Sequence, residues 1–304
     1  MTAPGGTPAI SIVIASADPG AVIHDCLTAL APQRARAEVI VAEGSRDGTA
    51  AMLHDRFPWV RVIEFRAATS LPRLRGVGMA AAAAPVIGIL DPWCIPAAGW
   101  VQSAVIAHEE RSELVIGGPV KLDSSERRSY ANWATYLFDY WEFVPPFPAG
   151  AVDVLSGNNI TYKRSALPDA ATLGAEGFWK AFTNARLRQA GHSLRAAEGL
   201  DVALKRAIPL GAFLRSRFHH GRSYAAMRVR GRAFTARLGF ALLTPALPLL
   251  FLARQARGLM RKPVARVWFV LCAPALLAFH LSWACGELCG YVAGAGRSDD
   301  AIRS

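Results

Sequence analysis

The stretch RGVGMAAAAAPVIGILDPW, Arg75 to Trp93, joins the end of an expected helix to a short apolar strand and a carboxylate. LPRLRGVGMAAAAA (71–84) is expected to be a helix with a proline near its start, and VIGIL (86–90) is an apolar run of strand length. Asp91 follows that strand directly and precedes the turn-forming Pro92. Because open α/β sheets bind ligands at the carboxyl ends of their strands, Asp91 is a candidate ligand-binding residue.

The same alternation of strand and helix runs through the first hundred residues. Near-continuous apolar strands that alternate with helices indicate an α/β fold, with a mostly parallel sheet and helices on both faces. No G-x-G-x-x-G or G-x-x-x-x-G-K-[ST] pattern follows these strands, which excludes a Rossmann dinucleotide fingerprint and a P-loop. The expected strands are 10–16, 37–43 and 60–65, and the expected helices are 21–31 and 47–57.

Beyond Gly99 the pattern becomes less regular. The sequence predicts a helix, then a strand ELVIGGPV (113–120), an aromatic helix YANWATYLFDYWEF (130–143) and a helix FWKAFTNARLRQAG (178–191). The rings of the aromatic helix could stack on a bound ligand, but aromatics at helical spacing more commonly pack in a core. These residues are Trp133, Tyr136, Tyr140 and Trp141.

The charge of the chain is distributed unevenly. The chain has 304 residues, 52% of them hydrophobic, and a net charge of +11. Residues 1–200 carry 18 Lys and Arg against 19 Asp and Glu, whereas residues 201–304 carry 16 against 4. The basic excess therefore adjoins the most apolar segments, which indicates an anionic membrane surface and argues against a nucleic-acid partner. Five cysteines without CxxC spacing argue against a disulfide framework and structural zinc.

Two apolar runs near the C-terminus predict a membrane-associated helical region over residues 233–304. The first, 239–253, is interrupted by Pro245 and Pro248 and is short for a span, whereas the second, 267–294, exceeds the roughly 20 residues that a span needs. The basic loop RQARGLMRKPVAR favours a first segment along the cytoplasmic leaflet and a second that crosses. A two-span hairpin and soluble packing of both runs remain open. The start, MTAPGGTPAI, lacks a leader pattern, so no signal peptide is expected.

Five short motifs in order resemble those of the family-2 inverting glycosyltransferases, which have a GT-A fold. They extend over most of residues 9–230, and their order and spacing are more specific than any one of them. The resemblance implies a GT-A-type, Rossmann-like domain over residues 1–232, followed by the membrane region. The motifs are SIVIAS, which resembles the first strand; VAEGSRDGTA, similar to VDDGSxDGT; RGVGMAAAAAPVIGILDPW, similar to RNxGxxxAxGxxIxFLDxD; LSGNNITYKRSAL, similar to GxNxxxRRxxL; and ARLRQAG, similar to RLRxxG.

The resemblance implies that side chains after the predicted strands bind the nucleotide. Glu43 falls where the family has a carboxylate that contacts the nucleobase, Arg75 matches the arginine of RNxG, and Asp91 matches the first aspartate of DxD. Ser16 and Asp18 follow the first strand, in the loop that faces the nucleotide. The alternative for Glu43 and Asp91 is a solvated strand end or a helix N-cap partner.

Acceptor-side and catalytic residues are also implied by the resemblance. Gly157, Asn158 and Asn159 match the acceptor-side motif, although Gly-Asn-Asn is also a common turn. The family base comes from an acid near the start of the helix that ends in RLRxxG; here Lys180 stands at or beside that place, and Glu176 is the nearest acid. Their spacing of four residues also suits an ion pair on a helix surface. A lysine could act as the base only if burial lowered its pKa.

A divalent ion, Mg²⁺ or Mn²⁺, with Asp91 as a ligand is a further implication of the resemblance. However, Pro92 and Trp93 stand where the DxD motif continues to its second carboxylate, and one carboxylate alone is a poor site for such an ion. We therefore predict nucleotide binding that is largely independent of divalent metal, with arginine or histidine meeting the diphosphate charge. The candidates in RSRFHHGRSY are Arg217, His220 and Arg222, and the alternative for this segment is a membrane-facing basic patch.

Together these features predict a membrane-associated glycosyltransferase of the inverting, hexosyl-transferring kind. We expect its catalytic domain on the cytoplasmic face of a bacterial-type inner membrane. It would transfer a sugar from a nucleotide-sugar donor to a lipid-linked or cell-envelope glycan acceptor, as in polysaccharide biosynthesis. The alternative is a catalytically impaired relative that acts as a binding or scaffolding partner at the membrane, and the Asp-Pro-Trp sequence favours that alternative.

Overall fold

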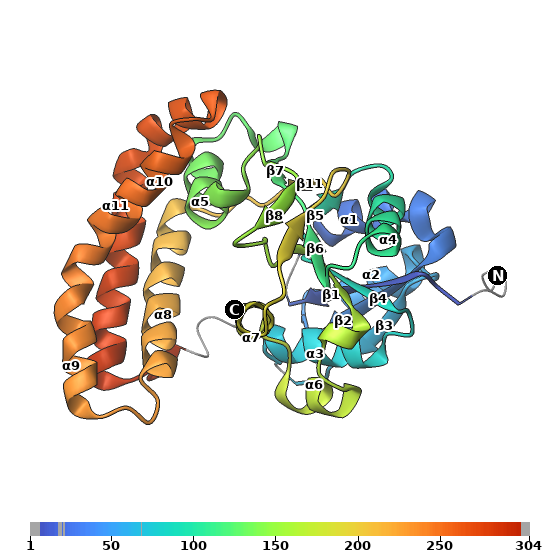
Figure 1. Cartoon of the computed structure of the whole chain (residues 1–304), viewed down its shortest axis with the longest axis horizontal. Helices are drawn as coiled ribbons and strands as arrows, with labels where there is room; N and C mark the ends of the chain where they lie inside the picture. The colour runs from blue at the N-terminus through green and yellow to red at the C-terminus, as the bar shows by residue number, and fades with distance from the viewer. Residues whose placement is uncertain (1–6, 18–19, 21, 68, 299–304) are drawn as a thin grey trace. The chain divides into compact units, whose positions relative to one another are not determined.

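The computed structural model describes residues 7–17, 20, 22–67 and 69–298 (Figure 1). The chain forms two compact units. The first, Met1–Asp123 with Pro145–Lys205, contains all the strands and is called the sheet unit. The second, Ser124–Val144 with Arg206–Ser304, is called the helical unit. This division differs from the boundary predicted at residue 232, because an internal segment and residues 206–232 join the C-terminal helices.

The first four strands of the sheet unit are parallel, as the apolar runs predicted. In the eight-stranded sheet, ordered β3-β2-β1-β4-β9-β6-β10-β8, β1 lies between β2 and β4. Ser16 at the end of β1 pairs in register with Glu43 at the end of β2. These strands are β1 (Ile10–Ser16), β2 (Ala37–Glu43), β3 (Arg61–Glu64) and β4 (Val86–Leu90).

The remaining strands are short and mixed in direction. β9 runs antiparallel to both β4 and β6, whereas β6 and β10 are parallel to each other. The predicted strand 113–120 divides into β6 and β7, which belong to different sheets. The strands are β5 (Cys94–Pro96), β6 (Val115–Gly117), β7 (Val120–Leu122), β8 (Gly150–Val152), β9 (Asn159–Lys163), β10 (Leu194–Ala196) and β11 (Val202–Leu204); β5, β11 and β7 form the second sheet.

Helices cover both faces of the large sheet, which confirms the predicted α/β architecture. Figure 1 shows α1 and α4 on one face and α3 and α6 on the other. α3 and α6 approach closely at Gly76, which has no Cβ atom. A Cβ atom at this position would overlap the carbonyl oxygen of Leu173. The helices are α1 (Val22–Leu30), α2 (Thr49–Arg56), α3 (Leu71–Ala81), α4 (Trp100–Glu110), α6 (Ala170–Glu176) and α7 (Lys180–Gln189), with the short 3-10 helices η1 (Ala31–Arg36) and η4 (Arg164–Ala166).

The region around Glu176 and Lys180 differs from the helix-surface ion pair that their spacing suggests. Glu176 is the last residue of α6, and Lys180 is the first residue of α7. Gly177 lies between them at φ 76°, a conformation that ends the first helix and that glycine adopts easily. The two side chains therefore do not lie one turn apart on one helix, and the ion-pair interpretation is wrong.

The helical unit is built around α11, a helix of 31 residues. α8 packs against it through small residues, because a Cβ atom on Gly286 or Gly290 would overlap backbone atoms of α8. Trp133 stacks on Trp268 at 5.0 Å between ring centroids, so part of the aromatic helix packs in this core. The elements are η2 (Ser124–Glu126), α5 (Tyr130–Tyr140), η3 (Trp141–Phe143), α8 (Leu210–Arg228), α9 (Phe234–Leu243), η5 (Thr244–Ala246), α10 (Leu247–Leu259) and α11 (Pro263–Ala293).

Two helical runs of this unit are long and apolar enough to cross a membrane, by length and composition alone. They are Thr235–Leu259, of 25 residues, and Pro263–Ala293. The first is longer than expected, because Pro245 and Pro248 lie in the first turns of η5 and α10, where a proline is tolerated. Only 17% and 33% of their most apolar stretches are buried, so both fit a membrane region.

Candidate active site

Several of the predicted site residues meet at one edge of the large sheet. β2, β1 and β4 are parallel neighbours, so their carboxyl ends lie along the same edge. Glu43 ends β2, Ser16 ends β1, and Asp91 directly follows β4. All three residues are buried. The sequence therefore places two carboxylates and a hydroxyl where an open α/β sheet holds its ligand.

The Glu43 carboxylate is fixed by hydrogen bonds to both of its oxygens. The Ser16 hydroxyl donates to Oε2, and the backbone N–H of Ser45 donates to Oε1 at 2.6 Å. The Ser45 hydroxyl also donates to Oε1. Donors from the end of β1 and from the turn after β2 therefore hold the carboxylate in one orientation. Asp18, the other predicted nucleotide residue of the first loop, lies outside the described residues.

Asp47 is a structural residue of this edge that the sequence reasoning did not single out. Its carboxylate accepts hydrogen bonds from the backbone N–H groups of Gly20 and Thr49, each at 3.1 Å. The contacts join the loop after β1 to the turn before α2. The signal in the sequence was the Asp-Gly-Thr of SRDGTA, since aspartate commonly bonds to the backbone two residues on.

Arg75 and Asp91 form a buried ion pair. Arg75 Nη2 lies 3.0 Å from Asp91 Oδ1, and their side chains are 12% and 8% exposed. Arg75 Nε is buried and has no hydrogen-bond partner among the described residues. The guanidinium has five N–H donors, so a ligand can still bind to it. The sequence predicted both residues as nucleotide-binding, and the structure brings them together.

Lys180 belongs to the same site. Its ammonium group donates a hydrogen bond to the carbonyl oxygen of Gly157, and a Cβ atom at Gly157 would overlap the lysine side chain. Burial and the charge of Arg75 lower the pKa of Lys180 to about 8, against the opposing effect of Asp91. At neutral pH the amine is still mostly protonated, because a pKa of about 8 lies above pH 7. We use the name charged cluster for Arg75, Asp91 and Lys180 together with Gly157, whose carbonyl oxygen accepts the lysine hydrogen bond.

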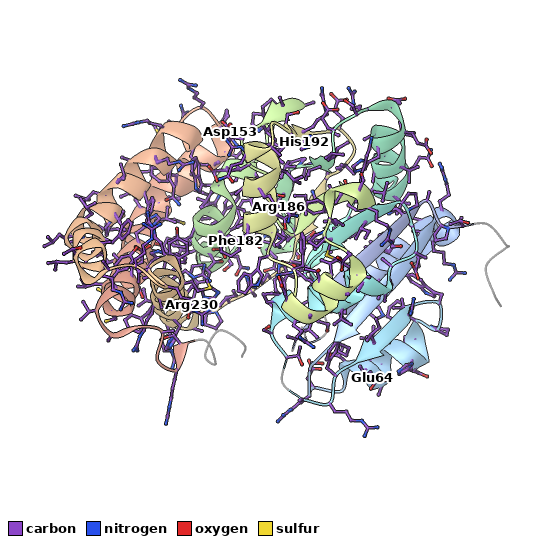
Figure 2. All side chains as sticks on the ribbon, turned by 60° about the horizontal axis from the view of Figure 1, so that its bottom comes forward. Glu64, Asp153, Phe182, Arg186, His192 and Arg230 are labelled. Carbon is purple, nitrogen blue, oxygen red and sulfur yellow. The ribbon has the colours of Figure 1, made fainter. Side chains whose placement is uncertain are left out.

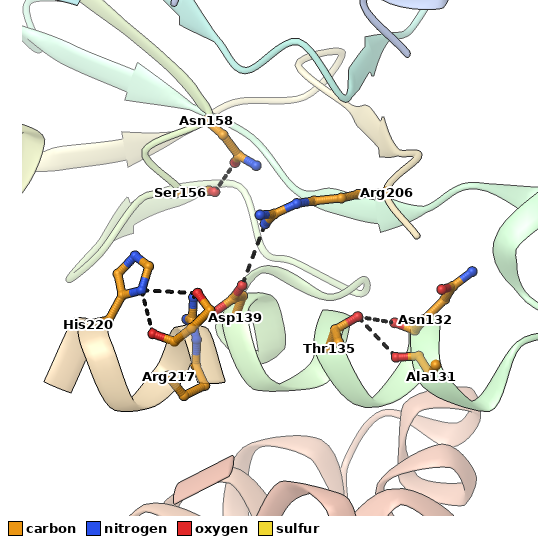
Figure 3. Close-up of polar contacts among 10 residues, drawn as sticks. Ala131, Asn132, Thr135, Asp139, Ser156, Asn158, Arg206, Arg217 and His220 are labelled. Carbon is orange, nitrogen blue, oxygen red and sulfur yellow. Dashed lines mark hydrogen bonds and ion pairs between the residues drawn. The ribbon is translucent and has the colours of Figure 1, made fainter. Parts of the chain in front are cut away.

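The two asparagines of the Gly-Asn-Asn segment have different surroundings. Asn159 is fully buried, accepts a hydrogen bond from Trp100 Nε1 at 3.0 Å, and donates to two backbone carbonyls, of Pro119 at 3.1 Å and Leu200 at 2.6 Å. Its amide therefore joins three segments of the sheet unit. Asn158 Oδ1 accepts from the Ser156 hydroxyl, a bond drawn in Figure 3.

An exposed aromatic pair flanks Lys180 and was not identified from the sequence. Trp179 and Phe182 are 44% and 63% exposed, and their ring centroids lie 6.1 Å apart. Phe182 projects from α7, as does Arg186 one turn further along (Figure 2). Glu176 is also exposed, at the end of α6. The signal was the sequence FWKAF, whose helical pattern leaves Trp179 and Phe182 outside the core formed in part by Phe178.

The three diphosphate candidates of α8 lie in the helical unit and already have partners there. Arg217 Nη1 lies 2.7 Å from Asp139 Oδ1 (Figure 3). The guanidinium also stacks over Phe213, with its Cζ 4.4 Å from the ring centroid. Arg222 Nε donates to the carbonyl oxygen of Gly294 at 2.8 Å. Burial, together with the charge of Arg217, lowers the pKa of His220 to about 4, so its ring is neutral at pH 7. His220 therefore supplies no positive charge to a diphosphate.

The two residues that follow Asp91 add no side-chain oxygen ligand for a divalent metal ion. Mg²⁺ and Mn²⁺ take oxygen ligands, but Pro92 has no side-chain ligand and Trp93 offers only an N–H donor. Arg75 is already paired with Asp91. Within the described part of the chain, no group of three or more His, Cys, Asp and Glu side chains is placed to hold an ion.

The fold and the buried polar residues at the carboxyl edge define an α/β protein with a candidate ligand site. The model of "Glycosyl transferase family 2" matches residues 11–169, and the chain belongs to this family. Among solved structures, the chain resembles a mannosyltransferase from Pyrobaculum calidifontis in complex with GDP-Man and Mn²⁺, with 18% identity and a TM-score of 0.54 over 93% of this chain and 88% of that one. This likeness confirms the GT-A fold.

A second solved structure, GalNAc-T7 with UDP, GalNAc and Mn²⁺, is 12% identical at a TM-score of 0.48. The match covers 67% of this chain and 45% of that one. A search of curated protein sequences gives no significant match. The protein is thus a glycosyltransferase by family, with a GT-A sheet unit and two apolar C-terminal helical runs.

Proposed function

We propose that the protein transfers a hexosyl group, with inversion, from a nucleotide-sugar to a lipid-linked or cell-envelope glycan acceptor. The observation that carries this proposal is the meeting of Ser16, Glu43, Arg75, Asp91 and Lys180 in the sheet unit of a family-2 chain. The catalytic domain would lie on the cytoplasmic face of a bacterial-type inner membrane. The domain boundary at residue 232 is part of the same proposal.

The donor nucleoside is assigned to the Ser16–Glu43 side of the edge. Both Glu43 oxygens are held by serine donors, so the carboxylate can accept a base or ribose donor without reorienting. Asp18 remains a candidate for the same nucleoside. GDP- and UDP-sugars are the first donors to test, and the neighbour's GDP-Man supports including GDP-mannose.

The acceptor is assigned to the side of the site that Trp179 and Phe182 flank. Exposed rings offer apolar faces on which a sugar stacks. Glu176, exposed beside this pair, is the proposed base that takes the proton of the acceptor hydroxyl. Gly157 and Asn158 would line the acceptor side, while Asn159 would support it from within the core.

A membrane location is supported by the surface of the helical unit. Leu242 and Val292 are 73% and 72% exposed, and further exposed leucines and valines follow α9, α10 and α11. Contiguous exposed apolar side chains of this kind mark a membrane or protein interaction site. Two exposed arginines, Arg257 in the last turn of α10 and Arg261 after it, suit anionic lipid headgroups.

The second candidate function is a non-catalytic binding partner at the membrane. Pro92 and Trp93 beside Asp91, and the pairing of Asp91 with Arg75, favour this candidate. Transfer assays distinguish the two. Full-length protein in membranes should convert UDP- or GDP-sugars to free nucleoside diphosphate in the presence of lipid extract, and Glu43→Ala should abolish the product. Nucleotide binding that Glu43→Ala removes, without turnover of any donor or acceptor, would instead establish the binding partner.

A further inference from the structure

The charged cluster carries two protein cations in a site that does not suit a metal ion. We propose that Arg75 and Lys180, and not a divalent cation, neutralise the diphosphate of the donor and of the departing nucleoside diphosphate. The inference rests on the proposed transferase function and specifies how the donor is held. It also replaces the three α8 residues as the predicted diphosphate ligands.

The chemistry requires positive charge at the departing group. In the transfer, the acceptor oxygen forms a bond to the anomeric carbon while the bond from that carbon to the diphosphate oxygen breaks. The bonding electron pair leaves with the diphosphate, and the proton of the acceptor hydroxyl passes to the base, proposed to be Glu176. Cationic groups that are already oriented toward the departing oxygens lower the barrier to this step.

Arg75 is suited to the diphosphate by its geometry. One N–H bond holds Asp91 at 3.0 Å, and the buried Nε donor is still without a partner among the described residues. A guanidinium presents its remaining donors in one plane and binds phosphate oxygens in pairs. Asp91 would then orient the arginine side chain, which makes Asp91 a positioning residue and not a metal ligand.

Lys180 is suited to the diphosphate by position and by its spare donors. Its bond to the Gly157 carbonyl uses one of three N–H groups, so two remain for phosphate oxygens. The residue also begins α7, and no side chain caps the start of that helix. Backbone N–H groups at an uncapped helix start carry positive potential. Arg75 and Lys180 lie close enough that the charge of Arg75 lowers the pKa of Lys180, so two cations belong to one site.

A divalent ion at Asp91 would meet an opposing set of contacts. The ion would have to share the Asp91 carboxylate with Arg75, which holds Oδ1, while its own charge repelled both Arg75 and Lys180. Neither of the next two side chains could compensate with an oxygen ligand. The same electrostatics favour an anion at this position, because Arg75 and Lys180 together exceed the single charge of Asp91.

The test is calorimetric titration of the full-length protein in detergent with UDP and GDP, in EDTA and in millimolar Mn²⁺. We expect binding in EDTA with an affinity close to that in Mn²⁺. Lys180→Met should weaken binding in EDTA by about tenfold or more, the loss expected for one charge-assisted hydrogen bond. Arg186→Met is the matched control, because this exposed arginine of α7 carries the same charge outside the cluster.

Arg75 needs a paired design, because Arg75→Met alone leaves the buried Asp91 carboxylate without its cation. The double variant Arg75→Met with Asp91→Asn removes both charges and should fold, and it should bind about tenfold or more weakly in EDTA. Circular dichroism confirms the fold of each variant.

Loss of nucleotide binding on chelation would overturn the inference but leave the transferase proposal intact. Binding in EDTA that is weakened neither by Lys180→Met nor by the double variant would also overturn the inference and leave the transferase proposal intact. No binding in EDTA or in Mn²⁺ would refute the transferase proposal, and this inference with it.

Discussion

The protonation of Lys180 should make donor binding depend on pH. Burial and Arg75 lower the pKa of this amine to about 8, so the free site loses a positive charge as pH rises through that value. A diphosphate binds the protonated form better, because the neutral amine lacks the charge. In EDTA, the affinity for UDP or GDP should therefore be highest near pH 7 and should fall above pH 8.

The size of the effect follows from the titration of one group. With a pKa of about 8, the protonated fraction falls from about nine tenths at pH 7 to about one tenth at pH 9. The affinity should therefore fall by about tenfold over this interval. The charged or titratable groups that act on Lys180 are Arg75, Asp91 and Cys94. Burial raises the pKa of the Cys94 thiol well above its ordinary value, so this thiol does not titrate in the interval.

The measurement is calorimetry of the full-length protein at half-unit steps of pH between 6.5 and 9.5, with chelator present throughout. Lys180→Arg provides the control, because an arginine keeps its charge over this range and should remove the pH dependence. An affinity that does not change between pH 7 and pH 9 would refute the role of the lysine as a cation. The reasoning would also fail if Lys180→Met kept the slope of the unaltered protein.

Three further predictions concern the scaffold and the membrane. Asn159→Ala should lower the free energy of unfolding by about 2–4 kcal/mol, since buried partners in Trp100, Pro119 and Leu200 lose their bonds; unchanged stability in denaturant titrations would contradict this. Gly286→Leu should prevent the packing of α8 on α11 and reduce folded yield, whereas Gly239→Leu, with open space around it, should be tolerated in size-exclusion chromatography. Full-length protein should float with anionic vesicles. The double variant Leu242→Glu with Leu249→Glu should reduce flotation more than the control Phe182→Glu, which changes an exposed ring of the sheet unit. Equal flotation of the two variants would argue against the apolar face as the membrane contact.

The long strands could be predicted because a strand that is buried on both faces of a sheet appears in the sequence as a continuous apolar run. AEVIVAE and VIGIL became β2 and β4 with the expected ends, and every residue of β4 is buried. The short strands β5, β7 and β11 have three residues each, too few for a periodic pattern. Their pairing depends on chain segments that are distant in the sequence, which a local pattern does not encode.

The site could be predicted in part for a similar reason. Asp91 was singled out because it directly follows a predicted strand, and Glu43 because it matches a family position at the end of another. Their place at one edge follows from the parallel order of β2, β1 and β4. The partner of Lys180 could not be found in this way, since Gly157 lies 23 residues away and meets it only in the folded chain. The helix break at Gly177 was missed because a positive φ angle is compatible with many glycine positions.

Arg217 illustrates the limit of reasoning from charge composition. A cluster of arginine and histidine in RSRFHHGRSY suggested an anion site, but Arg217 instead pairs with Asp139, 78 residues earlier in the chain. The carboxylate that neutralises it lies in α5, which the sequence marked only by its aromatic rings. A run of basic residues in a sequence locates positively charged side chains. Only the folded structure shows which of these side chains are already paired with a carboxylate.

Compared with the DxD motif that Arg75–Trp93 resembles, the residues at Asp91, Trp93 and Lys180 would form one consistent electrostatic change under the diphosphate contact that we propose. A DxD pair with a divalent ion combines two negative charges with two positive ones, so the set is neutral. Asp91 with Lys180 is also neutral, with one charge of each sign, and Arg75 is common to both arrangements. Replacing the second carboxylate by Trp93 removes repulsion that would otherwise require a metal, and an ammonium at the start of α7 supplies the cation. Neither change alone would keep the balance: Trp93 without Lys180 leaves the diphosphate short of a cation, and Lys180 with a metal leaves the site too positive. Trp93→Asp should therefore weaken diphosphate binding in EDTA and make it respond to Mn²⁺, and binding that stays the same in both conditions would show that residue 93 does not set the charge of the site.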